Sequence, residues 1–362
     1  LAEAIDRSAD LPLATQARLH AELGLELVFE NTDRKLSEAN VALDLARRSG
    51  SPETLGRVLA LRYATLWTAH TLEERMQVID DLDVIAAELN DRYLDFLASA
   101  NGTMAMLEFG DIERAAARLE RAERIADRLG EPRLRWFASV CRAKLEIITG
   151  QLDAADRSAD CGAALARRAG RADYMSYRAA QAFCIGFHRG RVDDLADAVD
   201  AAVERNPAVP AFRALRITMN AELGRLDAAR EELAELAGGG FLFPADFTQV
   251  VALCFSGHGA ARTGEVAIAR RVYDRLVVHE GRFADAGSTW YGAVDYFLGE
   301  LATAFGDFDR AADHLDSAER LHGQVGSGPM SDRTRVAADE LRRRRQSFDA
   351  SPASTDPGDI TS

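Results

Sequence analysis

The chain has 362 residues, of which 47% are hydrophobic, and its formal net charge is −14. This acidity argues against nucleic acid and membrane surfaces as partners, because both require basic residues to meet their negative charge. No apolar run approaches the roughly 18 residues that cross a bilayer, and the four cysteines are too irregularly spaced for a disulfide framework, so we expect a cytoplasmic protein.

Apolar residues recur at three- and four-residue steps from the first residues of the chain onward. Strand-like alternation of Val, Ile, Thr and aromatic residues is nearly absent. The pattern therefore predicts an all-α fold. Because the chain begins at Leu1, without a methionine and already in helical pattern, we expect it to be part of a longer polypeptide.

Six glycines recur at intervals of 34 to 42 residues, and in most cases an acidic residue follows closely. They are Gly110, Gly150, Gly190, Gly224, Gly264 and Gly306. A glycine just past a helix favours left-handed backbone, and an acidic residue favours the first turn of the next helix. Small or apolar residues mostly stand five, nine and twelve positions later, as at Ala115, Leu119 and Ala122. Each copy therefore predicts a helical hairpin.

Two weaker copies upstream extend the series to about eight hairpins, through Ala39/Leu43/Ala46 and Val78/Leu82/Ile85. The predicted hinges lie near residues 34, 73, 110, 150, 190, 224, 264 and 306. One hairpin cannot bury its apolar face alone, so the hairpins should stack into an α-solenoid over residues 1–346. We expect a cap helix at 331–346, and residues 347–362, rich in Ser, Pro and Asp, should be a disordered tail.

The last copy, "YGAVDYFLGELATAFGDFDRAADHLDSAERL", resembles the tetratricopeptide repeat (TPR). The residues at that repeat's spacings are Leu298, Gly299, Gly306, Asp307, Phe308, Ala311, Leu315 and Ala318. The resemblance implies TPR-like hairpins that wind into a right-handed superhelix.

Longer stretches, among them "RWFASVCRAKLEIITGQLDAADR", resemble the helical-repeat arm of large bacterial STAND-type ATPases. That family includes LuxR-type regulators and ATPase-coupled adenylate/guanylate cyclases, and it is common in actinobacteria. The resemblance implies a sensing and protein-interaction arm beside an ATPase or output domain. No G-x-x-x-x-G-K-[ST] loop, cyclase-like strand pattern or terminal helix-turn-helix is present, so we expect no such activity in this chain.

In TPR-like arrays the first helix of each hairpin lines the concave face. The same positions here are Phe137, Lys144, Tyr177, Cys184, His188, Cys254, His258, Arg262, Tyr296 and Glu300. Such a mixture of aromatic and charged residues suits a groove for a peptide, a protein segment or a small inducer. We therefore expect a non-catalytic binding module of a signal-transduction or transcription-regulatory protein, with no cofactor and no metal.

An all-helical enzyme or a metal-binding protein is the alternative. Asp193-Asp194-x-x-Asp197 has the spacing by which helical class I terpene synthases hold magnesium and diphosphate. The same run follows the hinge at Gly190, where acidic residues suit a helix N-terminus, and this explanation is favoured.

Two Cys/His pairs at i, i+4 spacing, Cys184/His188 and Cys254/His258, could each supply two zinc ligands. They lie two hairpins apart, which argues against one shared site. The basic run "LRRRRQ" at 341–346 could contact phosphates or an acidic partner, although arginines also suit a helix C-terminus.

Overall fold

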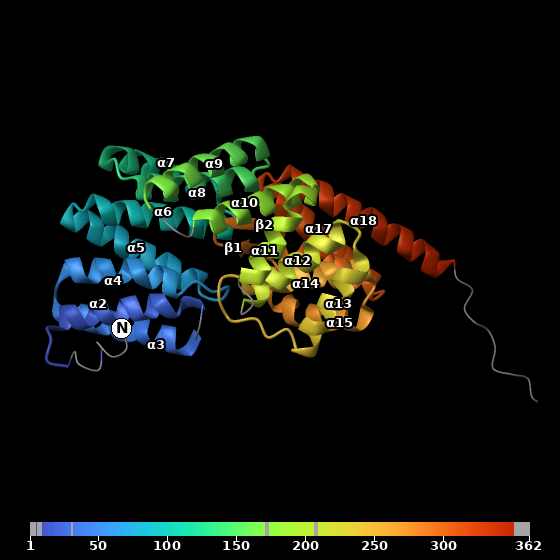
Figure 1. The fold of residues 1–362 in the computed structure, drawn as a ribbon, viewed down its shortest axis with the longest axis horizontal. Coiled ribbons are helices and arrows are strands. Elements are labelled where there is room, and N and C mark those ends of the chain that lie inside the picture. Colours follow the sequence, from blue (N-terminus) through green and yellow to red (C-terminus); the bar gives the residue numbers. More distant parts are fainter. Residues whose placement is uncertain (1–4, 6–8, 30–31, 171–173, 206–208, 351–362) are drawn as a thin grey trace, which may run out of the picture.

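The computed structural model describes residues 5, 9–29, 32–170, 174–205 and 209–350, and these are mostly helical (Figure 1). The all-α prediction is confirmed, since the only sheet of the described residues has two strands. Within this part of the chain, no helix combines the length and apolar character that a bilayer crossing requires.

The helices follow one another in antiparallel pairs. The first four pairs are α2 (Leu13–Glu26) with α3 (Thr32–Ser49), α4 (Pro52–Thr65) with α5 (Leu72–Leu89), α6 (Arg92–Phe109) with α7 (Ile112–Leu129), and α8 (Pro132–Ile148) with α9 (Leu152–Arg168). The later helices are α10 (Tyr174–Arg189), α11 (Ala196–Arg205), α12 (Pro210–Glu222), α13 (Leu226–Gly238), α14 (Gln249–Thr263), α15 (Val266–Leu276), α16 (Val294–Ala304), α17 (Phe308–Val325) and α18 (Gly328–Asp349). Short 3-10 turns lie at Leu27–Phe29, Asp193–Leu195 and Val277–His279.

The hinge glycines end the first helix of a pair, as predicted. Gly110 ends α6 with φ of 89°, and the Asp111 side chain accepts a hydrogen bond from the Arg114 amide at 3.0 Å to begin α7. The other five hinge glycines also have positive φ. The hinges expected near 34 and 73 lie slightly earlier, because α3 begins at Thr32 and α5 begins at Leu72.

The stripes of small residues are buried between paired helices, and Ala115, Leu119 and Ala122 have no exposed surface. The first helices of successive pairs pack side by side, α2 on α4 and α12 on α14 on α16. The fifth pair departs from this pattern, because α11 is short and packs mainly on α12. The hairpin order expected of a solenoid is present, and the right-handed winding stays a prediction.

A two-stranded antiparallel sheet, β1 (Phe283–Ala286) and β2 (Thr289–Ala293), interrupts the helices. We name residues 283–293 the central hairpin. The stretch quoted for the last repeat therefore begins within β2 at Tyr291, and its first helix begins only at Val294. Gly287 supplies a left-handed turn (φ +65°) between the paired Ala286 and Thr289, and β-forming Thr, Trp and Tyr follow it.

The central hairpin lies among the first helices of the pairs, where it contacts α6, α8, α10 and α14 (Figure 1). Trp290 is completely buried there. The Lys144 ammonium on α8 contacts the Asp285 carboxylate in an ion pair that is almost fully buried. The side of the helical array that was expected to form an open groove is therefore filled by the chain itself.

The loop between α4 and α5 meets the segment that precedes β1. Arg282 donates a hydrogen bond to the carbonyl of Ala69, 213 positions earlier in the chain. The rings of His70 and His279 lie 5.0 Å apart between their centroids. An early repeat thus contacts a late one, so the array closes on itself.

Helix α18 packs on α17 as the expected cap, and it runs beyond the predicted span of 331–346 at both ends. Residues 347–349 belong to this helix, so the tail was predicted to begin too early, and 351–362 lie outside the described residues.

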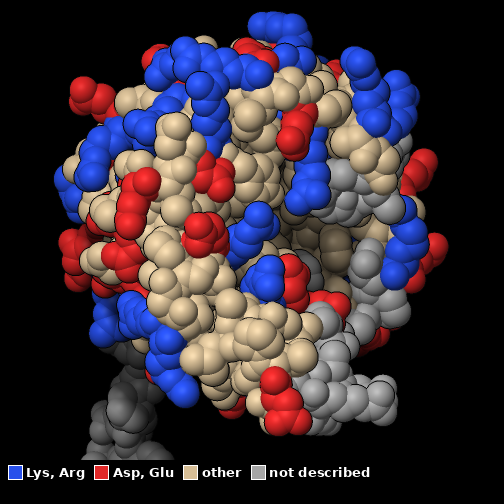
Figure 2. Space-filling model, turned by 90° about the vertical axis from the view of Figure 1, so that its left-hand side faces the viewer, with Lys and Arg blue, Asp and Glu red and all other residues tan. Residues whose placement is uncertain are grey.

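The end of the molecule that carries the first hairpins interleaves basic and acidic side chains (Figure 2).

Candidate functional site

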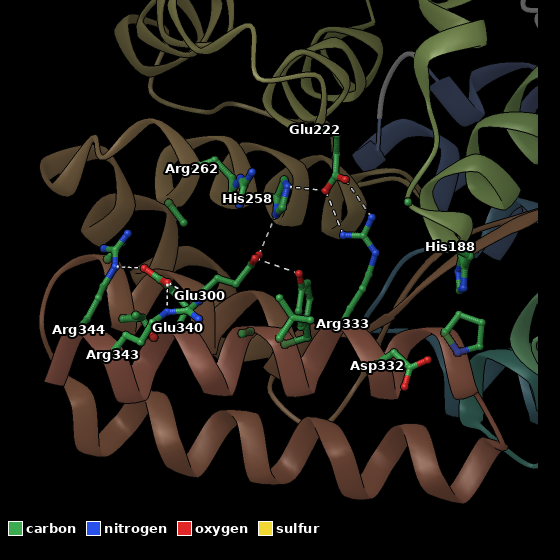
Figure 3. Close-up of a pocket in the computed structure, with 18 of the residues that line it drawn as sticks. His188, Glu222, His258, Arg262, Glu300, Asp332, Arg333, Glu340, Arg343 and Arg344 are labelled. Carbon is green, nitrogen blue, oxygen red and sulfur yellow. Dashed lines mark hydrogen bonds and ion pairs between the residues drawn. The ribbon is translucent and has the colours of Figure 1, made fainter. Parts of the chain in front are cut away.

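A cavity of about 730 Å³ lies between α10, α14, α16 and the cap helix α18 (Figure 3). Five residues predicted for the concave face line it: His188, His258, Arg262, Tyr296 and Glu300. The four-residue spacing of His258 with Arg262 on α14, and of Tyr296 with Glu300 on α16, puts each pair on one helix face.

A chain of ion pairs and hydrogen bonds crosses the inner end of the cavity (Figure 3). Arg333 of α18 donates two hydrogen bonds of 3.0 Å to the Glu222 carboxylate at the end of α12. His258 lies between two carboxylates, with Nε2 at 3.0 Å from Glu222 and Nδ1 at 2.8 Å from Glu300. The Tyr296 hydroxyl donates to the other Glu300 oxygen at 2.9 Å.

The protonation states in this chain of contacts follow from burial and from the neighbouring charges. Burial alone would lower the pKa of His258, but Glu300 and Glu222 raise it to about 9. Burial would raise the pKa of Glu222, but His258 and Arg333 hold it well below its usual range. At neutral pH the network therefore holds a histidinium between two carboxylates.

Arg333 also joins the cap helix to α10. Its guanidinium carbon lies 3.9 Å from the centre of the Phe187 ring, and its Nη2 donates a hydrogen bond of 2.7 Å to the Phe187 carbonyl. Neither Arg333 nor Glu222 was predicted for the site. No local pattern relates them, because 111 positions separate them in the chain.

Arginines slightly outnumber carboxylates along the lining of the cavity. Five arginines line it against four carboxylates, in addition to His258, and one of the five, Arg189, is paired with Asp153 and Asp156 outside the cavity. Arg343 and Arg344, from the basic run, pair with Glu340 at 2.8 Å each. Arg262 is exposed, and no described residue pairs with it. This arrangement can attract an acidic ligand and offers it one uncommitted guanidinium.

The other residues predicted for the concave face lie elsewhere. The prediction that Lys144 and Cys184 are open to a groove is wrong, because the central hairpin covers both. Tyr177 is half-exposed, with its ring edge-on to Trp136 at 5.2 Å, and Phe137 is partly buried beside the same Trp136 ring. These two aromatic residues lie outside the cavity.

The residues that an all-helical enzyme or a metal-binding protein would use do not form one site. Asp193, Asp194 and Asp197 are exposed and do not line the cavity. The Cys184 thiol and the His188 ring both contact the Trp290 carbonyl, at 3.0 and 2.8 Å. His258 contacts carboxylates instead, and Cys254 is buried in the core.

Neither a family model nor a curated protein sequence matches the chain. A helical-repeat fold serves many functions, so the chemistry of the site, and not the fold, indicates the function.

Proposed function

We propose that the chain is a non-catalytic sensing module that binds a small acidic organic ligand in the cavity between α14, α16 and α18. The observation that carries the proposal is Arg262, an arginine of the cavity lining without a described partner. The whole chain has a net charge of −14, so an excess of arginine over carboxylate along this lining contrasts with the protein as a whole.

The size and walls of the cavity favour a small molecule. Its volume of about 730 Å³ falls within the range of roughly 300–1,000 Å³ that is usual for small-ligand sites. Ala261, Ala304, Val336 and Ala337 supply apolar surface for the body of such a ligand. A peptide along the central groove is disfavoured, because the central hairpin occupies that space.

Ligand binding can be passed on through the cap helix. The cavity is lined by α18 on one side and by α14 and α16 on the other, and Arg333 with Glu222 bridges one end of it. A ligand that favours one spacing of α18 shifts the population toward that spacing. The resemblance to the arm of STAND-type ATPases supports a place in a larger cytoplasmic bacterial signalling or regulatory protein, where α18 would act on a partner or on a neighbouring ATPase or output domain.

Calorimetric titration of the chain with a panel of dicarboxylates and sugar phosphates tests the proposal. We expect Arg262→Ala to weaken binding of the best ligand by roughly 10- to 100-fold, because it removes a charge-assisted hydrogen bond. Arg128→Ala, which removes an exposed arginine of α7 outside the cavity, is the matched control and should bind normally.

Equal binding by Arg262→Ala and wild type would place the ligand elsewhere. ATP turnover by the isolated chain, abolished by a single substitution, would contradict a non-catalytic role.

A further inference from the structure

We propose that Glu280, Asp295 and His314 form a binding site for a divalent metal ion of the zinc or manganese class. One ligand atom from each of the three side chains lies within 4.8 Å of the other two. Glu280 follows the 3-10 turn after α15, Asp295 lies in the first turn of α16, and His314 lies on α17. None of them lines the cavity of the proposed function, so the two proposals are independent.

Asp295 has one oxygen in use and one free. Its side chain is completely buried, and Oδ2 accepts a hydrogen bond of 2.8 Å from the Gly281 amide. Oδ1 is also buried and has no hydrogen-bond partner among the described residues. A buried carboxylate oxygen without a donor is costly, and a cation would relieve that cost.

His314 is arranged in the same way. Its Nε2 lies 2.9 Å from the Tyr273 hydroxyl, and its buried Nδ1 has no hydrogen-bond partner among the described residues. Nδ1 is directed at the cluster, since it lies 3.4 Å from a Glu280 oxygen. When Nε2–H donates to Tyr273, the Nδ1 lone pair is left for a metal, which is how metal-binding histidines are usually oriented.

The donor set fits a divalent transition metal. One imidazole nitrogen and two carboxylates suit zinc or manganese, and the two negative charges balance the ion. The Glu280 side chain is 56% exposed, which gives the ion a path from solvent and leaves room for water ligands.

The ion would fasten the base of the central hairpin. Glu280 precedes β1, Asp295 follows β2, and His314 belongs to another helix, so one ion would tie both ends of the hairpin to α17. Because such a site forms only in the folded chain, metal binding should also stabilise the fold.

Equilibrium dialysis of the chain against Zn²⁺ and, separately, Mn²⁺, followed by elemental analysis, tests the site. We expect wild type to retain about one ion per chain, and Glu280→Gln and His314→Gln to bind it at least roughly 10- to 100-fold more weakly. The control is His20→Gln, which disrupts a different His–Glu contact, that of His20 with Glu38 at 2.6 Å. This control should bind like wild type.

Glu280→Gln changes a largely exposed side chain, so its fold should persist, and circular dichroism checks that it does. A folded Glu280→Gln variant that has lost the ion supports the site. Wild type that retains neither metal, or a Glu280→Gln variant that retains it equally well, overturns the proposal.

Discussion

At the scale of single residues, the buried histidines differ in charge at neutral pH. His258 is flanked by two carboxylates and is protonated at neutral pH. His188 and His322 instead hydrogen-bond to the backbone of the central hairpin. Burial lowers the pKa of His188 to about 4 and that of His322 to about 3, so both stay neutral. One residue type thus serves as a cation in the cavity and as a neutral hydrogen-bonding group beside the hairpin.

The raised pKa of His258 predicts a loss of stability in alkaline solution. The folded value of about 9 lies above the ordinary value of 6.5, so this contribution is fully present below pH 6.5 and is lost as the pH rises through 9. We expect it to amount to about 3 kcal/mol in the free energy of unfolding.

Chemical denaturation at several pH values between 6 and 10 measures this loss. His258→Gln should be less stable than wild type at pH 6, and its stability should change less between pH 6.5 and 9. A variant with the same pH dependence as wild type would show that His258 is not the titrating group.

At the scale of elements, close helix packing explains the glycine of the TPR-like motif. A Cβ added at Gly299 on α16 would lie 2.6 Å from Cγ of Leu315 on α17, and 3.4 Å from the Ala311 carbonyl. Leu315 is itself buried, so it has little room to move. The motif residues that the sequence pattern singles out thus bring two paired helices into contact.

Gly299→Ala is therefore expected to destabilise the protein by roughly 1–3 kcal/mol, because overpacking outweighs the better helix propensity of alanine. Gly323→Ala is the matched control, since an added Cβ on α17 meets nothing within 4 Å there. That variant should be as stable as wild type or more so. Thermal unfolding compares the three proteins, and equal midpoints for both variants would contradict the packing argument.

The elements differ in how well they can be predicted from their local sequence. The hinge at Gly110–Asp111 was predictable, because a left-handed glycine and a capping aspartate act within a few residues. The central hairpin was not, because it is an insertion between two repeats, and the stretch that resembles the last repeat begins at Tyr291 within β2. The one local signal was Gly287 followed by Thr289, Trp290 and Tyr291, a turn before β-forming residues.

At the scale of the whole molecule, one hydrophobic core runs from α6 to α18, and smaller clusters serve the first two hairpins. Because α2 and α3 belong to a small terminal cluster, they should open more often than the rest of the chain. We expect amide hydrogens of α2 and α3 to exchange faster than those of α14 and α16. Exchange measured by mass spectrometry tests this, and uniform protection would contradict it.

Contacts over long sequence separations set the limit of prediction at this scale. The helical class and the hairpin order follow from residues that are close in sequence. The cavity depends on the ion pair of Arg333 with Glu222, and the contact between early and late repeats depends on Arg282 and Ala69. A repeat pattern in the sequence predicts neither of these pairings. The positions on α14 and α16 and the basic run that supplies Arg343 and Arg344 were therefore singled out from the sequence, while Arg333 and Glu222 were missed.

The contact between Arg282 and Ala69 has a consequence for how such a chain can change in evolution. Open repeat arrays gain and lose units readily, because each unit contacts only its neighbours. Here a duplicated or deleted hairpin between α5 and α15 would move the Ala69 loop away from the segment that it contacts. We therefore expect homologues of this protein to keep the same number of repeats. Substitutions on the outer helices and insertions in the loops between them should be tolerated.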